Sequence, residues 1–123
     1  PEVYDDTRAA FESRFEQRSK DMPFDSTFYM YDATSVLLMA MDRAVAAGST
    51  LPDGLIAAIV EVASFGGVVV RWGDFAQARA ANSTGREMYY VGLTGPVSLA
   101  ADGSRSRGTS SPWAVEGGTI VER

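Results

Sequence analysis

A long apolar segment, residues 26–47, constrains the fold of this chain more than any other feature. Its pattern predicts one helix in which only Asp32, Asp42 and Arg43 are charged, and its alanines allow neighbouring elements to approach closely. A helix that is apolar around so much of its surface is usually packed on two sides. We therefore expect other elements to cover this helix on both sides.

Three shorter helices are expected around the long one. In residues 4–19 apolar side chains recur every three or four positions, which predicts an amphipathic helix whose charged residues form a solvated face. Residues 55–62 and 75–81 are also predicted to be helical, and glycines follow both segments.

Strand patterns become frequent in the second half of the chain. Short runs of β-branched and aromatic residues, bounded by glycine and proline, predict strands. The last two runs flank Glu116-Gly117-Gly118 and predict a terminal hairpin. With helices first and strands last, the predicted class is α/β. The predicted strands are residues 68–70, 88–91, 96–99, 113–115 and 119–121.

Composition excludes several kinds of chemistry. The 123 residues include no cysteine and no histidine, so thiolate nucleophiles, disulfides, histidine bases and thiolate or imidazole metal sites are absent. The net charge of −5 argues against a nucleic-acid interface. No catalytic constellation, metal site, phosphate-binding glycine loop or cofactor motif is present, so we expect a protein that is not an enzyme. No apolar run approaches the roughly 20 residues needed to span a bilayer.

Asp32 is the one acidic residue in an apolar setting, and it has two interpretations. A buried carboxylate with a raised pKa would be a functional candidate. Alternatively, Asp32 lies near the helix N-terminus and is partly solvated or bonded to backbone. Residues 92–95, Gly-Leu-Thr-Gly, have the sequence pattern of a loop that clamps the nucleotide backbone in RNA-binding proteins. That loop lies between helices, whereas these residues lie between predicted strands, so the similarity is one of sequence alone.

Aromatic residues cluster at the start of the long helix and also have two interpretations. They pack in the core, or they form the wall of a ligand cleft into which the hydroxyls of Ser26, Thr27 and Tyr29 point. A helix N-terminus also offers free backbone N–H groups for a carboxylate. Physical reasoning leaves both interpretations open. The cluster consists of Phe24, Phe28, Tyr29 and Tyr31.

The order of motifs along the chain resembles a known family. The motifs are Phe11 and Phe15, Tyr31-Asp32-Ala33, Leu37-Leu38, Ala47-Gly48, Gly73-Asp74-Phe75-Ala76, Gly85-Arg86-Glu87-Met88-Tyr89-Tyr90, Gly92-Leu93-Thr94-Gly95-Pro96-Val97, Ala101-Asp102-Gly103 and Trp113-Ala114-Val115-Glu116-Gly117-Gly118. Together they look like the C-terminal third of a type I periplasmic solute-binding protein of the branched-chain amino acid class. The chain departs from the family at Leu99-Ala100, where a Phe-Asp pair is usual.

The resemblance implies a fold and a division of the chain. The family has two α/β lobes joined by three crossover segments, with ligand held between the lobes. This chain would be a single segment, residues 1–123, of that fold. Residues 1–91 would supply helices and strands of one lobe, and residues 92–123 a crossover and the terminal strands. The stretch matching a family ligand position is Ser26, Thr27, Phe28 and Tyr29.

The resemblance also implies a function. The whole protein would bind a small polar solute, such as an amino acid, and deliver it to the permease of an ABC importer. Its location would be periplasmic or extracellular, either free or lipid-anchored. The alternative is a ligand-sensing domain of a receptor or regulator with the same fold and no transport role.

The first residues suggest a piece of a longer protein. The chain begins at Pro1 without an initiator methionine, which indicates that the sequence starts inside a longer protein. Without its lobe partners the chain would leave the two-sided helix and strand edges uncovered, and such surfaces seek partners. We therefore expect this chain to self-associate, as a dimer or by strand exchange. We also expect that the chain by itself does not bind the ligand of the longer protein.

Overall fold

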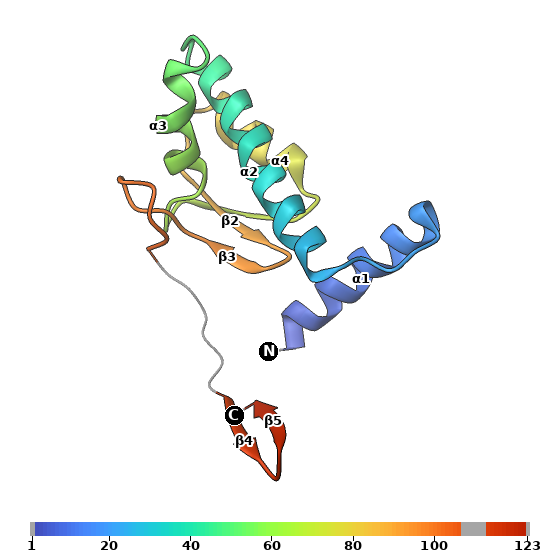
Figure 1. The fold of residues 1–123 in the computed structure, drawn as a ribbon. Helices are drawn as coiled ribbons and strands as arrows, with labels where there is room; N and C mark the ends of the chain where they lie inside the picture. The colour runs from blue at the N-terminus through green and yellow to red at the C-terminus, as the bar shows by residue number, and fades with distance from the viewer. Residues whose placement is uncertain (1, 107–112, 123) are drawn as a thin grey trace.

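The computed structural model describes residues 2–106 and 113–122, and within these ranges the chain is a mixture of helices and strands (Figure 1). None of the described helices is both long and apolar enough to cross a membrane. The elements in chain order are α1 (Glu2–Ser19), α2 (Asp25–Ala46), α3 (Asp53–Val62), β1 (Val68–Arg71), α4 (Phe75–Ser83), β2 (Met88–Gly92), β3 (Gly95–Val97), β4 (Trp113–Glu116) and β5 (Thr119–Glu122).

The main sheet has the strand order β1-β2-β3, with β2 in the centre. Strands β1 and β2 are parallel, and α4 makes the connection that parallel strands require. Strands β2 and β3 are antiparallel and follow each other through a tight turn. Strands β4 and β5 form a separate two-stranded hairpin, in which Val115 faces Ile120, at the place the sequence predicts.

Helix α2 packs against α3 and α4 and supplies one side of the core. Its buried residues are three or four positions apart, so they line one broad face of the helix. Val36, Met39 and Ala40 of this face meet Val62 of α3 and Tyr90 of β2 in one cluster. Helices α3 and α4 both pack on this one face (Figure 1), so the expectation that other elements cover the helix on both sides is wrong for the part of the chain that the structure describes.

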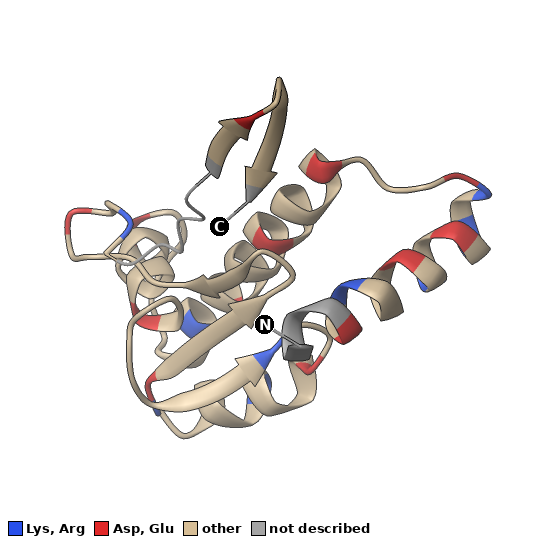
Figure 2. Cartoon of the chain, turned by 90° about the horizontal axis from the view of Figure 1, so that it is seen from below, with Lys and Arg blue, Asp and Glu red and all other residues tan. Residues whose placement is uncertain are grey.

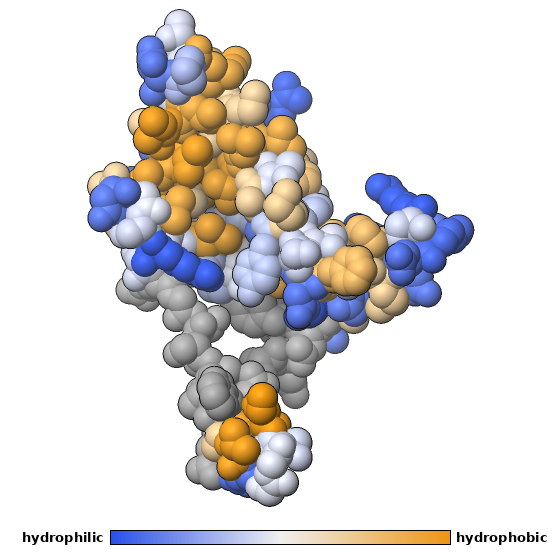
Figure 3. Space-filling model, in the orientation of Figure 1, coloured by the Kyte–Doolittle hydropathy of each residue, from blue (hydrophilic) through white to orange (hydrophobic). Residues whose placement is uncertain are grey.

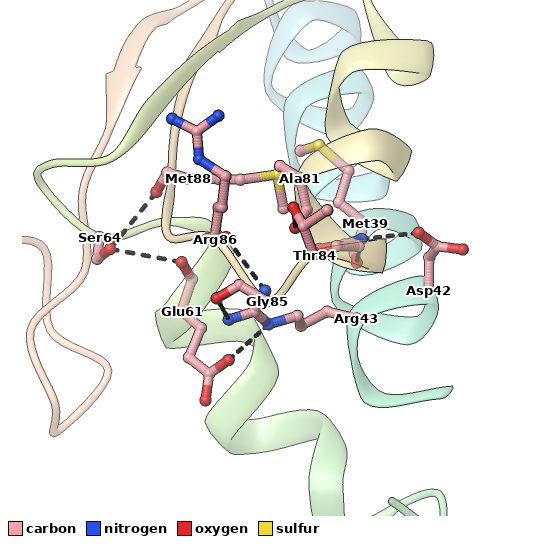
Figure 4. Close-up of polar contacts among 11 residues, drawn as sticks. Met39, Asp42, Arg43, Glu61, Ser64, Ala81, Thr84, Gly85, Arg86 and Met88 are labelled. Atoms are coloured by element: carbon pink, nitrogen blue, oxygen red, sulfur yellow. Dashed lines mark hydrogen bonds and ion pairs between the residues drawn. The ribbon is translucent and has the colours of Figure 1, made fainter. Parts of the chain in front are cut away.

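One buried arginine joins three segments of the fold. Arg43 of α2 donates from Nε to Oε2 of Glu61 on α3, at 2.8 Å. Its two other nitrogens donate to the backbone oxygens of Arg86 at 3.1 Å and Gly85 at 3.3 Å, in the turn before β2 (Figure 4). Since Arg carries several donors in a fixed fork, a single side chain fixes α2, α3 and this turn relative to one another.

A row of apolar residues on α2 remains exposed and is here called the apolar stripe. Its members are four positions apart, so they form one ridge along the helix. Ile56 of α3 is also an exposed apolar residue, with 77% of its surface accessible. Figure 3 shows this surface as an orange area over α2 and α3. The stripe consists of Tyr29, Ala33, Leu37, Met41 and Val45.

Helix α1 carries many of the chain's charges and contacts the rest of the fold through aromatic side chains. Figure 2 shows acidic and basic residues along α1, whereas β2 and β3 carry none. Phe11 is buried against Phe28 of α2, with the ring centroids 5.6 Å apart. Arg8 lies over the Phe28 ring at 4.1 Å and forms an ion pair with Asp25. The charges of α1 are therefore only partly a solvated face.

Candidate functional site

Asp32 is the only buried carboxylate among the residues that the structure describes, with 4% of its surface exposed. Oδ1 accepts hydrogen bonds from the Tyr90 hydroxyl at 3.1 Å and from the Leu93 backbone N–H at 2.9 Å. Oδ2 accepts from the backbone N–H and the hydroxyl of Thr94, both at 2.7 Å. Both carboxylate oxygens are therefore occupied by donors from β2 and the turn after it.

The turn that binds Asp32 is a two-residue hairpin connection. Strand β2 ends at Gly92 and β3 begins at Gly95, so Leu93 and Thr94 form the turn. Gly95 has a φ of +97°, a conformation that side chains with a Cβ rarely adopt. A Cβ on Gly92 would overlap the carboxyl group of Asp32. The Gly-Leu-Thr-Gly motif thus lies between strands, as expected, and its first glycine makes room for the carboxylate.

The structure decides in part between the two interpretations of Asp32. The bonds to backbone N–H groups confirm one element of the structural interpretation. The expectation of a partly solvated residue near the helix N-terminus is wrong, because Asp32 lies about two turns into α2, on its buried face. The carboxylate holds the β2–β3 turn against the helix.

Two tyrosine hydroxyls near Asp32 stay protonated. Burial raises the pKa of the Tyr90 hydroxyl, the charge of Asp32 raises it further, and a hydrogen bond with Ser35 opposes the shift. Burial also raises the pKa of the Tyr31 hydroxyl. At neutral pH Tyr90 therefore acts as a hydrogen-bond donor to Asp32, and the cluster is fully hydrogen-bonded.

The four predicted ligand residues do not converge on one cavity. Phe28 is buried in the aromatic core, and Ser26 is exposed to solvent. Thr27 lines a hollow beside α1, whereas Tyr29 lines a groove on another side of α2. Consecutive helix positions point in different directions, so a run of four residues cannot line one small site. Of the two interpretations of the aromatic cluster, core packing applies to Phe28.

Two concave sites lie on either side of α2. The first, here called the aromatic hollow, has a volume of about 490 Å³ and lies between α1, α2 and Trp72. The second, the aliphatic groove, has a volume of about 470 Å³ and lies between α2, α3 and β3. The aliphatic groove is lined mainly by Ala33, Val36, Leu37, Ile59, Val97 and Leu99. The aromatic hollow is lined by Phe11, Arg14, Phe15, Arg18, Thr27, Met30, Tyr31, Thr34 and Trp72.

Asp32 and the two concave sites present different kinds of side chain. Within the described residues no group of three or more acidic side chains is placed to hold a metal ion. Asp32, the one buried acid there, also lines the aliphatic groove, and its two oxygens accept four hydrogen bonds from protein donors. The concave sites present aromatic rings, aliphatic side chains and arginines, which are residue types found in many small-molecule sites.

The chain was also compared with protein-family models, with curated proteins and with solved structures. None of them matches it.

Sequence reasoning did not single out the arginines or the tryptophan of the aromatic hollow. Arg14 and Arg18 belong to the helix face that the pattern assigned to solvent, and Trp72 follows β1 without belonging to any motif. A signal was present in the spacing, because positions 11, 14, 15 and 18 of one helix share a face. Only the fold shows that Trp72 lies opposite that face.

Proposed function

We propose that this chain is the C-terminal portion of a type I periplasmic solute-binding protein that binds a small polar solute such as an amino acid. In such a protein two lobes close over the ligand by a hinge motion. The closed form then docks on the permease of an ABC importer. The protein would act in the periplasm or outside the cell, and its function involves no covalent step.

The observation that carries this proposal is the contact between the two motifs most important to the resemblance. Asp32 of the Tyr-Asp-Ala motif and Leu93 of the Gly-Leu-Thr-Gly motif are 61 positions apart, yet they are hydrogen-bonded. The glycine of one motif leaves the space that the carboxylate of the other fills. The residues shared with the family thus form one structural unit, which supports common ancestry over chance similarity.

The exposed apolar surfaces give further support. The apolar stripe and the aliphatic groove leave a large apolar area uncovered by the described residues (Figure 3). Apolar patches of this kind mark surfaces that other protein covers. A fragment of a two-lobed α/β protein, with helices first and short strands last, would expose such surfaces toward the rest of its lobe.

A ligand-sensing domain of a receptor or regulator is the second candidate, because it would use the same fold. Transport requires a permease that recognises the closed form, whereas sensing requires a signalling segment. Copurification of the whole protein with an ABC permease would favour transport. Control of transcription or of a kinase by the ligand would favour sensing.

The proposal predicts that amino acids stabilise the protein expressed from its whole reading frame. A ligand at about 100 times its dissociation constant should add about 2.7 kcal/mol to the free energy of unfolding, because it binds only the folded state. Thermal unfolding with a panel of amino acids, amides and small organic acids measures this effect. Tyr29→Ala should reduce the stabilisation, whereas Val45→Ala, which is similarly exposed on the same helix, should leave it unchanged.

If no compound of the panel raises the unfolding temperature, the solute-binding proposal fails. Loss of stabilisation in both variants would mean that substitutions in α2 weaken ligand binding by disturbing the fold. Tyr29 would then not be identified as a ligand contact. The readout needs no identified ligand, since each panel member is tested separately.

The chain of 123 residues alone should form dimers or larger species through the apolar stripe. Leu37→Glu places a charge in the stripe and should weaken self-association about tenfold, because that charge would have to be desolvated. Leu38→Glu, on the same helix but outside the stripe, is the matched control. Light scattering over a range of protein concentrations measures both variants. A monodisperse monomer of the unsubstituted chain at every concentration contradicts the prediction.

A further inference from the structure

The aromatic hollow has rigid walls made of three aromatic rings. The centroid of Phe11 lies 5.1 Å from that of Tyr31 and 5.9 Å from that of Trp72, and the Tyr31 and Trp72 centroids are 6.2 Å apart. All three ring pairs are steeply inclined, with interplanar angles of 67°, 80° and 74°. Such edge-to-face contacts fix the rings in place. Phe11 is itself buried against Phe28, so the wall is anchored in the core.

The hollow also carries positive charge. Phe11, Arg14, Phe15 and Arg18 line it from one face of α1, where phenylalanine and arginine alternate. The Arg14 guanidinium lies 5.5 Å from the centre of the Trp72 ring. No carboxylate is among the residues that line the hollow. In a chain with a net charge of −5, this is a local positive site.

The two arginines differ from their neighbour on the same helix. Arg8 forms ion pairs with Glu12 at 3.2 Å and Asp25 at 2.8 Å. In contrast, neither Arg14 nor Arg18 has a salt bridge within the described part of the chain. Both residues are exposed and line the hollow, so their guanidinium groups are available to pair with an anion.

We propose that the aromatic hollow binds a small flat aromatic carboxylate. The ring of the ligand packs against Tyr31 and Trp72, and its carboxylate pairs with Arg14 and Arg18. The hydroxyls of Thr27 and Thr34, which also line the hollow, are further donors to the carboxylate. A volume of about 490 Å³ is within the range of small-molecule sites. This inference goes beyond the proposed function, since it concerns this chain alone and needs no second lobe.

Tryptophan fluorescence tests the proposal with benzoate as the probe. The chain contains two tryptophans, so the Trp113→Phe variant leaves Trp72 as the single reporter inside the hollow. Benzoate should change the fluorescence with a dissociation constant of about 1 mM or lower. Benzamide has the same ring without the charge and should bind about tenfold more weakly. Cyclohexanecarboxylate has the charge without the aromatic ring and should also bind more weakly.

Charge variants test the role of the arginines. The double variant Arg14→Gln with Arg18→Gln should weaken benzoate binding about tenfold or more. Arg79→Gln makes the same kind of charge change on α4, outside the hollow, and should leave the affinity within about twofold.

Three results would overturn the proposal: no fluorescence change with benzoate at about 10 mM, equal binding of benzoate and benzamide, or unchanged affinity in the double variant. The comparison of benzoate with benzamide is made on the chain with its arginines intact. It therefore remains decisive if the double variant fails to fold.

Discussion

Replacing Asp32 with alanine is expected to lower the free energy of unfolding by about 3–5 kcal/mol. The substitution removes the only acceptor for the backbone N–H groups of Leu93 and Thr94 that the described residues supply. It also removes the carboxylate oxygen that accepts the hydrogen bond from the hydroxyl of the buried Tyr90. Buried donors without an acceptor cost about 1–3 kcal/mol each, because they have lost water without gaining a bond. Urea unfolding at a protein concentration where the chain is monomeric measures the effect.

Two matched variants show whether the loss comes from this cluster. Tyr90→Phe removes one donor and keeps the carboxylate, so it should cost only about 1 kcal/mol. Asp25→Ala removes an exposed carboxylate from the same helix and should cost less than about 1 kcal/mol. If Asp32→Ala costs no more than Asp25→Ala, the carboxylate does not hold the turn.

The regular elements follow from local sequence patterns. The apolar periodicity of residues 26–47 predicts α2 to within one residue at each end, since the observed helix is Asp25–Ala46. Glycine pairs and β-branched runs likewise predict β1, β2 and the β4–β5 hairpin. Local patterns suffice here because the residues that stop a helix or a strand lie next to it in the chain.

Element ends differ from prediction where a long-range contact determines them. Helix α4 continues to Ser83, beyond the predicted residue 81. The Asn82 side chain is buried against α2 and donates to the Met39 oxygen at 3.0 Å and to Asp42 at 2.7 Å. These hydrogen bonds stabilise about half a turn of additional helix, although the local sequence favours a turn. Residues that lie 40 positions or more away in the chain are not visible to a local pattern.

The candidate sites were less predictable than the elements. The helical spacing shows that Phe11, Arg14 and Arg18 share a face, but not that Trp72 packs opposite that face. The family resemblance assigns one ligand site to the run from Ser26 to Tyr29, whose residues are adjacent in sequence. In a helix, adjacency separates side chains by about 100°, so the same residues serve the core, the hollow and the groove.

Gly92→Ala is expected to destabilise the chain by about 3 kcal/mol. The new Cβ would overlap the Asp32 carboxyl group, so the carboxylate must move away from the turn. That movement stretches the hydrogen bonds to Leu93 and Thr94, and it pushes the side chain toward a core that is already filled. The backbone of Gly92 is not in the left-handed region, so the loss would come from space and not from φ. Urea unfolding measures this variant too.

A double-mutant cycle isolates the collision from other effects of the added methyl group. In the Asp32→Ala background the obstructing carboxylate is gone, and Gly92→Ala should cost less than about 1 kcal/mol. The coupling energy between the two positions should then be about 2 kcal/mol. Gly48→Ala is the comparison in which space is free and only the φ of +72° resists the substitution, and its cost should be the same in both backgrounds. Equal costs of Gly92→Ala in both backgrounds would mean that the glycine and the carboxylate are energetically independent. The two motifs would then not form one structural unit, and the proposed function would lose that support.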